Sequence, residues 1–90
     1  MEIEFDREKS RENGLRRGLP FSRVATFDFE TALVAEDTRI DYGEVRFVAI
    51  GKIGQRLHVV AYTMRGEALR VISLRRANER EAARYDKARP

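Results

Sequence analysis

Four arginines border two apolar runs in the stretch YTMRGEALRVISLRRA, which begins at Tyr62. These arginines are Arg65, Arg70, Arg75 and Arg76. A guanidinium group cannot lose its charge in a protein, so it is costly to place against an apolar core. Its planar fork of N–H donors matches the oxygens of a phosphate or a carboxylate. The four side chains therefore either extend into water or are held rigidly to bind an anion.

The acidic segment EDTRIDYGE offers a second kind of chemistry. Asp37, Asp41 and Glu44 could hold a metal ion, but Arg39 and Arg46 lie close to them in the sequence. Pairing of arginine with carboxylate explains this pattern better, and it would also hold Arg46 in place. We therefore expect no metal site and no cofactor. Glu44 is also a candidate general base.

The composition limits the class of protein. The chain has 90 residues, no cysteine and one histidine, which excludes disulfides, thiolate metal sites and histidine-rich metal sites. The histidine, His58, lies in the apolar run RLHVVAY, where we expect it to pack or to face a partner. Most of the 18 basic residues are arginine. This bias fits nucleic acid or an acidic protein partner, and a GC-rich genome explains it equally well.

No apolar run has the length of a transmembrane helix, and MEIEFDREKS lacks the pattern of a signal peptide. We expect a cytoplasmic protein that consists of a single domain over residues 1–90.

Helix signals occur near both ends of the chain. Asp6 is placed to cap a first helix and Gly18 to end it. Pro20 opens a shorter second helix. Asn78 and Glu81 match a capping box at the start of a third. The predicted helices cover residues 7–17, 21–27 and 78–87.

The first predicted helix cannot bury an apolar stripe, because Leu15 is its only large apolar residue. Lys9, Asn13, Arg16 and Arg17 follow the i, i+4, i+7, i+8 spacing and share one face. A polar face of this kind could contact RNA. For Asn13, a hydrogen bond to a nearby loop is an equal alternative.

Alternating and apolar runs predict five strands, of which the last three form an antiparallel meander. The first meander strand has apolar residues on both sides. Phe47 and Ala49 belong to one side, and Val48 and Ile50 to the other. A sheet that is apolar on both faces needs cover on both, and three short helices cannot supply it. We expect one face to be partly open to a ligand or partner. The strands are predicted near residues 3–5, 32–35, 45–53, 57–64 and 68–74.

Three segments together resemble the BrnT family of bacterial type II toxins. They are IEFDREKSRENGLRRGLPF, EDTRIDYGEVRFVAIG and YTMRGEALRVISLRRANEREAARY, and they occur in the family's order. The resemblance implies an α+β, RelE-like fold with a small antiparallel β-sheet, two N-terminal helices and one C-terminal helix. It further implies a metal-independent endoribonuclease that cleaves cellular RNA and inhibits translation and growth.

The resemblance also implies partners. A BrnA-type antitoxin with a ribbon-helix-helix domain would neutralise the toxin, and the complex would reach operator DNA only through that antitoxin. Two toxins and two antitoxins would form a heterotetramer. No membrane is involved.

On this resemblance, Arg65 and Arg75 are expected to clamp phosphate, with Arg46 and Arg17 as supports and Glu44 as base. If the site is catalytic, Arg65 and Arg75 should converge with Arg17 and Arg46 on the open face of the sheet. Further RNA contacts are expected from Lys9, Asn13, Arg16, Arg70 and Arg76.

One position departs from the family pattern. The family usually has K-H-G where this chain has Arg16-Arg17-Gly18, so Arg17 stands in place of a histidine. Arginine stabilises charge but cannot shuttle a proton near neutral pH. The alternative reading is therefore a catalytically impaired homologue that acts as an antitoxin-binding module in operon autoregulation.

Overall fold

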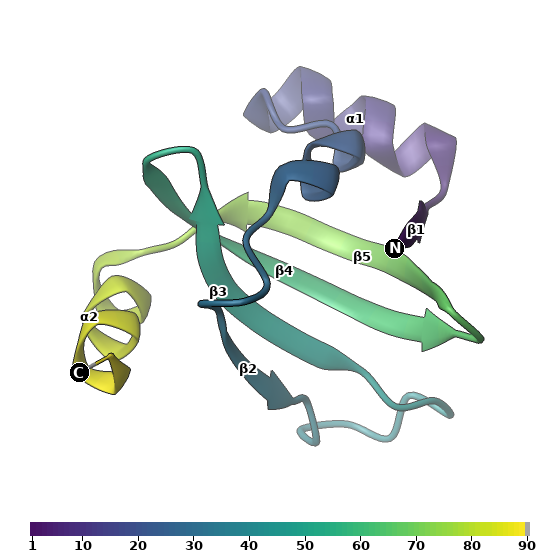
Figure 1. Cartoon of the computed structure of the whole chain (residues 1–90). Coiled ribbons are helices and arrows are strands. Elements are labelled where there is room, and N and C mark those ends of the chain that lie inside the picture. Colours follow the sequence, from purple (N-terminus) through teal and green to yellow (C-terminus); the bar gives the residue numbers. More distant parts are fainter. Residues whose placement is uncertain (90) are drawn as a thin grey trace.

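The computed structural model describes residues 1–89 and shows a mixed α+β fold built on one five-stranded sheet (Figure 1). The strand order is β1-β5-β4-β3-β2. The predicted fold class is confirmed at this level. In chain order the elements are β1 (Glu2–Glu4), α1 (Arg7–Arg17), η1 (Phe21–Thr26), β2 (Leu33–Glu36), β3 (Phe47–Ile53), β4 (Arg56–Arg65), β5 (Ala68–Arg76) and α2 (Glu79–Ala88).

Two details differ from the predicted arrangement. β1 runs parallel to β5, whereas the other strand pairs are antiparallel, so the sheet is mixed. The second N-terminal helix, η1, is a 3₁₀ helix rather than an α-helix. Its two buried residues, Phe21 and Val24, are three positions apart. Three residues per turn place both on the same side, which suits a six-residue segment lying on a sheet.

The main core lies on the sheet face that η1 covers. Val24 of η1 is 1% exposed and packs in one cluster with Val60 of β4 and Leu69 of β5. Gly51 of β3 is required here, because an added Cβ would lie 2.6 Å from the ring of Phe27. Aromatic packing against the glycine therefore closes this side of β3.

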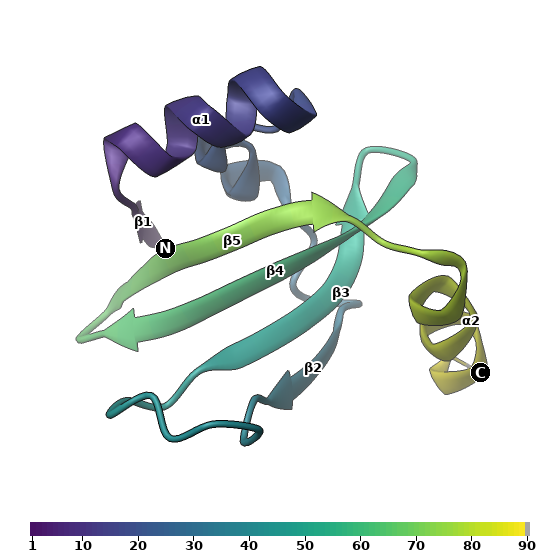
Figure 2. The ribbon, with the colours of Figure 1, turned by 180° about the vertical axis from the view of Figure 1, so that it is seen from behind.

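The opposite face of the sheet is covered at one end only. Tyr85 of α2 packs there with Ile50 and Val59 in a smaller cluster. Over the rest of this face no helix of residues 1–89 lies in front of the strands (Figure 2). The prediction that one face is partly uncovered is confirmed, and its use by a ligand or partner stays a prediction. We call this side the open face.

Helix α1 docks through polar side chains. Asp6 accepts hydrogen bonds from two backbone amides at its start, and Gly18 ends it with φ of 69°, as predicted. Its buried residues are Ser10 and Asn13. The Ser10 hydroxyl oxygen accepts from the Phe21 amide at 2.8 Å. Leu15 is 80% exposed, so the helix is not held by an apolar stripe.

Asn13 connects α1 to the sheet. Its Nδ2 donates to the carbonyl of Leu19 at 2.7 Å and to that of Leu74 at 2.9 Å. β1 pairs with β5 only between Ala68 and Arg70, so the rest of that edge has no strand partner in the described chain. One amide therefore satisfies a carbonyl on β5 and ties the helix to it.

Helix α2 is anchored by Glu81. Asn78 and Glu81 form the predicted capping box. The same carboxylate accepts two hydrogen bonds from the Arg75 guanidinium, at 2.8 and 2.7 Å. Glu81 thus caps the helix and pairs it with β5.

Replacing Asn13 tests how α1 is held. Asn13→Ala leaves two buried carbonyls without their donor, so we expect a loss of about 2–3 kcal/mol in the free energy of unfolding. Urea denaturation followed by circular dichroism measures this loss. Glu12→Ala, at an exposed position of the same helix, is the control. A loss below about 0.5 kcal/mol for Asn13→Ala would contradict the docking role.

Glu81 gives stability a dependence on pH. Hydrogen bonds from Arg75 lower the pKa of Glu81 from 4.5 to about 2. A carboxylate with a depressed folded-state pKa contributes stability above its unfolded pKa and loses it as the pH falls through the folded pKa. Glu81→Gln can keep the capping box, so it removes the ion pair selectively. We expect it to lower stability by about 1 kcal/mol at pH 7.

This difference between wild type and Glu81→Gln should shrink between pH 4.5 and pH 2, the window set by the two pKa values. Thermal unfolding at several pH values measures it. Glu79→Gln, at an exposed position of the same first turn, is the control. A difference that does not change with pH would show that the ion pair is not its source.

Candidate nucleic-acid interface

Strand register separates the arginines of the last hairpin. Arg65 pairs with Ala68 at the turn, whereas Arg75 pairs with Val59 toward the other end of β5. The five-residue step from Arg70 to Arg75 spans about 16 Å along the strand. The expectation that Arg65 and Arg75 converge with Arg17 and Arg46 is therefore not met. Arg46 and Arg65 line one cleft, Arg17 and Arg75 line a second, and the two clefts meet along β5.

The first cleft lies near the β4–β5 turn and is called the hairpin cleft. It has a volume of 210 Å³ and brings together Arg46, Arg65 and Arg70. Glu44 and Lys9 also line it, so five predicted site residues meet here. The complete lining is Asp6, Lys9, Glu44, Arg46, Thr63, Arg65, Arg70, Val71 and Ile72.

Arg46 is fixed in the hairpin cleft from two sides. Its Nε donates to Glu44 Oε2 at 3.0 Å. Its guanidinium carbon lies 4.1 Å from the centre of the Tyr42 ring, in a cation–π contact. The guanidinium has five N–H donors and uses one in a side-chain hydrogen bond within the described chain. Arg46 is thus oriented while most of its donors stay available to an anion.

The support for Tyr42 comes from Asp37. The Asp37 carboxylate accepts from Arg39 Nε and from the Tyr42 hydroxyl, at 2.9 and 3.0 Å. These hydrogen bonds, chiefly those from Arg39, hold the pKa of Asp37 well below its usual range. Its amide in turn donates to the carbonyl of Arg46 at 2.7 Å. The expected pairing of the acidic segment with its own arginines is confirmed for Asp37 with Arg39 and Glu44 with Arg46.

The other two arginines of the hairpin cleft are less restrained. Arg70 forms a salt bridge with Glu4 of β1, with 3.5 Å between Nη1 and Oε1. Arg65 is exposed and forms no salt bridge within residues 1–89. Below them, Thr63 is buried and its hydroxyl donates to the carbonyl of Val45 at 2.7 Å. The cleft therefore combines one fixed cation with two that can adjust to a ligand.

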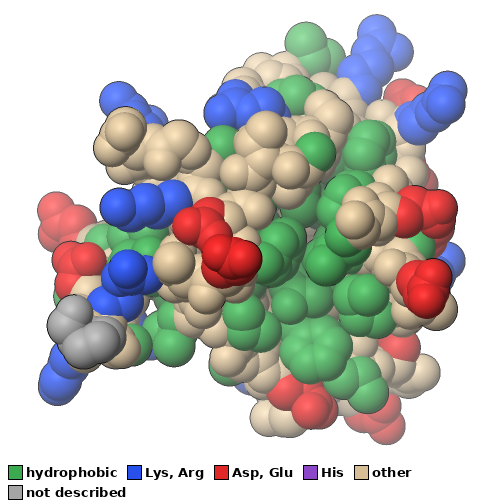
Figure 3. All heavy atoms as spheres, viewed as in Figure 1, with side chains coloured by type: hydrophobic (Ala, Val, Ile, Leu, Met, Phe, Trp, Pro, Cys, Tyr) green, Lys and Arg blue, Asp and Glu red, His purple; other side chains and the backbone are tan. Residues whose placement is uncertain are grey.

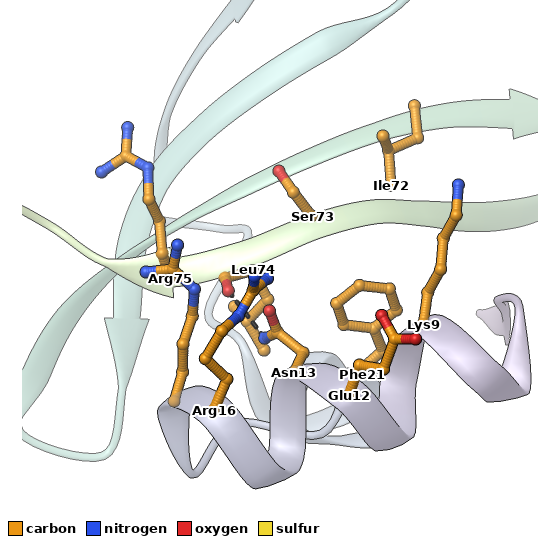
Figure 4. A pocket seen from close by; sticks show the side chains of 10 residues that line it. Lys9, Glu12, Asn13, Arg16, Phe21, Ile72, Ser73, Leu74 and Arg75 are labelled. Carbon is orange, nitrogen blue, oxygen red and sulfur yellow. Dashed lines mark hydrogen bonds between the residues drawn. The ribbon is translucent and has the colours of Figure 1, made fainter.

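The second cleft, the helix cleft, lies between α1 and β5 and has a volume of 360 Å³. Figure 4 shows Lys9 and Arg16 reaching from α1 toward the strand that carries Arg75. Lys9 and Ile72 line both clefts, so the two are continuous along β5. Its complete lining is Lys9, Glu12, Asn13, Arg16, Arg17, Phe21, Ile72, Ser73, Leu74 and Arg75.

Arg75 is the most restrained arginine of the helix cleft. Its two-point pairing with Glu81 raises its pKa, and its side chain remains 39% exposed. It also borders a third hollow of 550 Å³, the central groove, on the open face. This groove is lined by Ala35, Glu36, Asp37, Thr38, Arg39, Val48, Val59, Ala61, Ser73, Arg75, Glu81 and Arg84.

Three predicted or considered residues lie apart from this chemistry. Asn13 lines the helix cleft, but both of its amide hydrogens are used within the fold. Arg76 is exposed at the end of β5 and lines none of the three hollows. His58 is 4% exposed, burial lowers its pKa, and its ring contacts the Arg56 carbonyl. His58 is a packing residue, as expected.

The sequence did not predict the residues that line the hollows between the arginines or that hold an arginine in place. Thr63, Ser73 and Arg84 line the hollows, and Tyr42 orients Arg46. Their residue types carry no distinctive signal. Glu81 was noticed only as a helix cap, because its pairing with Arg75 depends on how α2 folds back onto β5.

The arrangement suits a polyanion. Cations line one continuous path along β5, and the carboxylate of Glu44 lies among them. Within residues 1–89, no three His, Cys, Asp or Glu side chains form a group that could hold a metal ion. None of the described helices has the length and apolar character needed to cross a membrane.

Comparison with known proteins places the chain in a family. Searches of curated proteins and of solved structures gave no match. The family described as "Ribonuclease toxin, BrnT, of type II toxin-antitoxin system" matches residues 5–81, which include both clefts and the acidic segment. The chain therefore belongs to the BrnT family of ribonuclease toxins of type II toxin–antitoxin systems.

Proposed function

We propose that this protein is an endoribonuclease toxin that cleaves cellular RNA in the cytoplasm, and thereby inhibits translation and growth. The supporting observation is the hairpin cleft, where Arg46, Arg65 and Arg70 meet beside Glu44. Guanidinium groups suit phosphate oxygens, and a neighbouring carboxylate suits a proton acceptor. The active unit is a single domain over residues 1–90.

The proposed cleavage uses the substrate's own 2′-OH and no metal ion. Glu44 takes the proton of the 2′-OH, whose oxygen attacks the adjacent phosphorus. Arg46 and Arg65 bind the non-bridging oxygens as negative charge develops there. The bond to the 5′ oxygen breaks and that oxygen takes a proton from water. The products are a 2′,3′-cyclic phosphate and a 5′-OH end.

The continuous path along β5 supports a single RNA strand as substrate. Lys9 lies between the two clefts, and Arg16, Arg17 and Arg75 line the second. The hairpin cleft holds the phosphate that is cut, and the helix cleft holds a neighbouring phosphate. Arg75 reaches that phosphate when it gives up or shares its contact with Glu81.

A second function is favoured by two observations. Arg75 is already paired with Glu81, and the clefts contain no histidine, because the only one is buried at position 58. A catalytically impaired toxin homologue would still bind an antitoxin and take part in operon autoregulation. The two functions differ in RNA cleavage by the purified chain.

The proposed partner is a BrnA-type antitoxin with a ribbon-helix-helix domain. Membership of a type II toxin–antitoxin family implies an antitoxin, and its BrnA type is our proposal. Because ribbon-helix-helix domains are dimeric, two toxins and two antitoxins would form a heterotetramer. That complex would contact operator DNA through the antitoxin.

Single substitutions test the hairpin cleft. Arg46→Ala and Arg65→Ala should each lower the rate of RNA cleavage about 10²-fold, because each removes a donor to the charged transition state. The measurement uses a labelled oligoribonucleotide and the purified chain. Replacing the ribose at the cut position by 2′-deoxyribose should abolish cleavage there.

The matched control is Arg11→Ala, which removes an exposed arginine from α1 that lines none of the three hollows. Its rate should stay within about twofold of wild type. Equal losses for Arg11→Ala and Arg65→Ala would mean that only overall charge matters, and the assigned site would be wrong.

Arg17→His separates the two functions. It introduces at the helix cleft the residue that the family usually has there, and a histidine can exchange protons near neutral pH. If the missing histidine is what impairs the chain, RNA cleavage should rise at least tenfold, with a bell-shaped pH profile absent from wild type. If cleavage occurs in the hairpin cleft as proposed, it should stay within about threefold of wild type, because position 17 lines the helix cleft. Arg11→His, on the same helix but lining none of the three hollows, is the control. A folded Arg17→His protein and a wild type that both leave RNA intact would support the binding module.

A further inference from the structure

The sheet face that carries the main core is not covered along its whole length. η1 lies over one end of this face, and none of the described helices lies over the other end (Figure 1). Near that end, Val34, Val45 and Met64 are 44%, 54% and 41% exposed. Figure 3 shows hydrophobic side chains gathered in one continuous area on this side of the molecule.

Strand register places these side chains on the same face. Val34 lies opposite Ala49, which belongs to the main core, and Met64 lies opposite Leu69, which belongs to it as well. Phe47 packs against this core, and Val45 precedes it by two positions and so has the same parity. We call Val34, Val45, Phe47 and Met64 the apolar patch.

The patch rests on a fixed aromatic floor. The Tyr62 ring is stacked on Phe47 with centroids 5.5 Å apart, and Phe29 meets Tyr62 edge-on at 5.6 Å. Scattered exposed apolar residues are normal, but a continuous area on a rigid sheet marks an interaction site. A sheet face is stable when a second layer covers it, and η1, with six residues, covers only part.

The margins of the patch are acidic. Glu36 lies opposite Phe47 at the end of edge strand β2, where it borders the patch as well as the central groove, and Glu30 directly follows Phe29. Both are exposed. Acidic side chains border the hydrophobic area in Figure 3, whereas the arginines of the hairpin cleft lie on the open face. The patch therefore complements a partner element with an apolar stripe and basic flanks.

We infer that the apolar patch is the docking surface for the antitoxin, which lays an amphipathic helix with Lys and Arg flanks across it. A helix completes the missing layer over the sheet, and its basic flanks meet Glu30 and Glu36. The inference rests on the proposed antitoxin partnership and not on the RNA chemistry. Anchoring of the antitoxin and contact with RNA then use opposite faces of one sheet.

Measurements of antitoxin affinity test whether the apolar patch is the binding surface. The probe is the protein encoded by the gene that adjoins the gene of this chain, titrated calorimetrically against the purified full chain. Val45→Asp/Met64→Asp should weaken Kd at least 100-fold, because it places two charges in the contact. Val34→Asp alone, on a different strand, should weaken it at least tenfold and serves if the double variant does not fold.

Two further variants test the acidic margin and the specificity of the patch substitutions. Glu30→Lys/Glu36→Lys should weaken binding about tenfold at low salt and less at high salt, because screening reduces the repulsion. Leu15→Asp is the matched control, since Leu15 is 80% exposed on α1. It should stay within twofold of wild type. Circular dichroism and thermal unfolding confirm that each variant is folded.

Several results would overturn the inference. Unchanged affinity in folded patch variants would do so, as would equal weakening by Leu15→Asp. Loss of binding only when Arg46, Arg65 or Arg70 is replaced would place the antitoxin on the open face. A dimer of the chain alone that the patch substitutions dissolve, with antitoxin affinity intact, would assign the patch to a second copy.

Absence of binding to the wild-type chain would overturn the antitoxin partnership together with the inference. The oligoribonucleotide assay would be unaffected by that result, so the two proposals fail separately.

Discussion

The side-chain amide of Asn13 joins a helix that has no apolar stripe to the edge of the sheet. One nitrogen donates to the carbonyl of Leu74 on β5 and to that of Leu19, which follows the helix. The position of α1 sets the width of the helix cleft and the direction of its basic residues. A buried polar contact of this kind is costly to break, because both carbonyls would lose their partner inside the protein. Binding geometry and stability here depend on the same group.

Ion pairs in this protein orient cations without neutralising them all. Asp37 holds Tyr42, Tyr42 supports Arg46, and Glu44 completes the contact. Arg75 is treated differently, since Glu81 occupies its fork with two short hydrogen bonds. On the open face, Arg46 is therefore oriented with free donors for an anion. Arg75 would have to release the Glu81 carboxylate before it could bind one. This difference supports the separate roles proposed for the two clefts.

The sheet separates two kinds of surface. Its open face carries charge in clefts along β5, and its other face continues the apolar core beyond the reach of η1. A thin sheet in a 90-residue chain has too few helices to cover both sides. The uncovered areas differ in chemistry, because alternate residues of each strand point to opposite faces. If both proposals hold, RNA and the antitoxin contact different side chains.

Local signals in the sequence determined the ends of α1, the capping box of α2, the meander and the pairing of the acidic segment with its own arginines, because each depends on residues only a few positions apart. The parallel pairing of β1 with β5 was decided by the tertiary structure, as was the separation of Arg65 from Arg75. Strand register sets these distances, and register depends on contacts between distant segments. The tertiary structure also decided the Glu81 contact with Arg75 and the burial of Asn13, because the type of a polar residue does not indicate which distant group it will bond. The residue types predicted an anion site, and strand register with the packing of α1 against β5 places the predicted residues in two clefts.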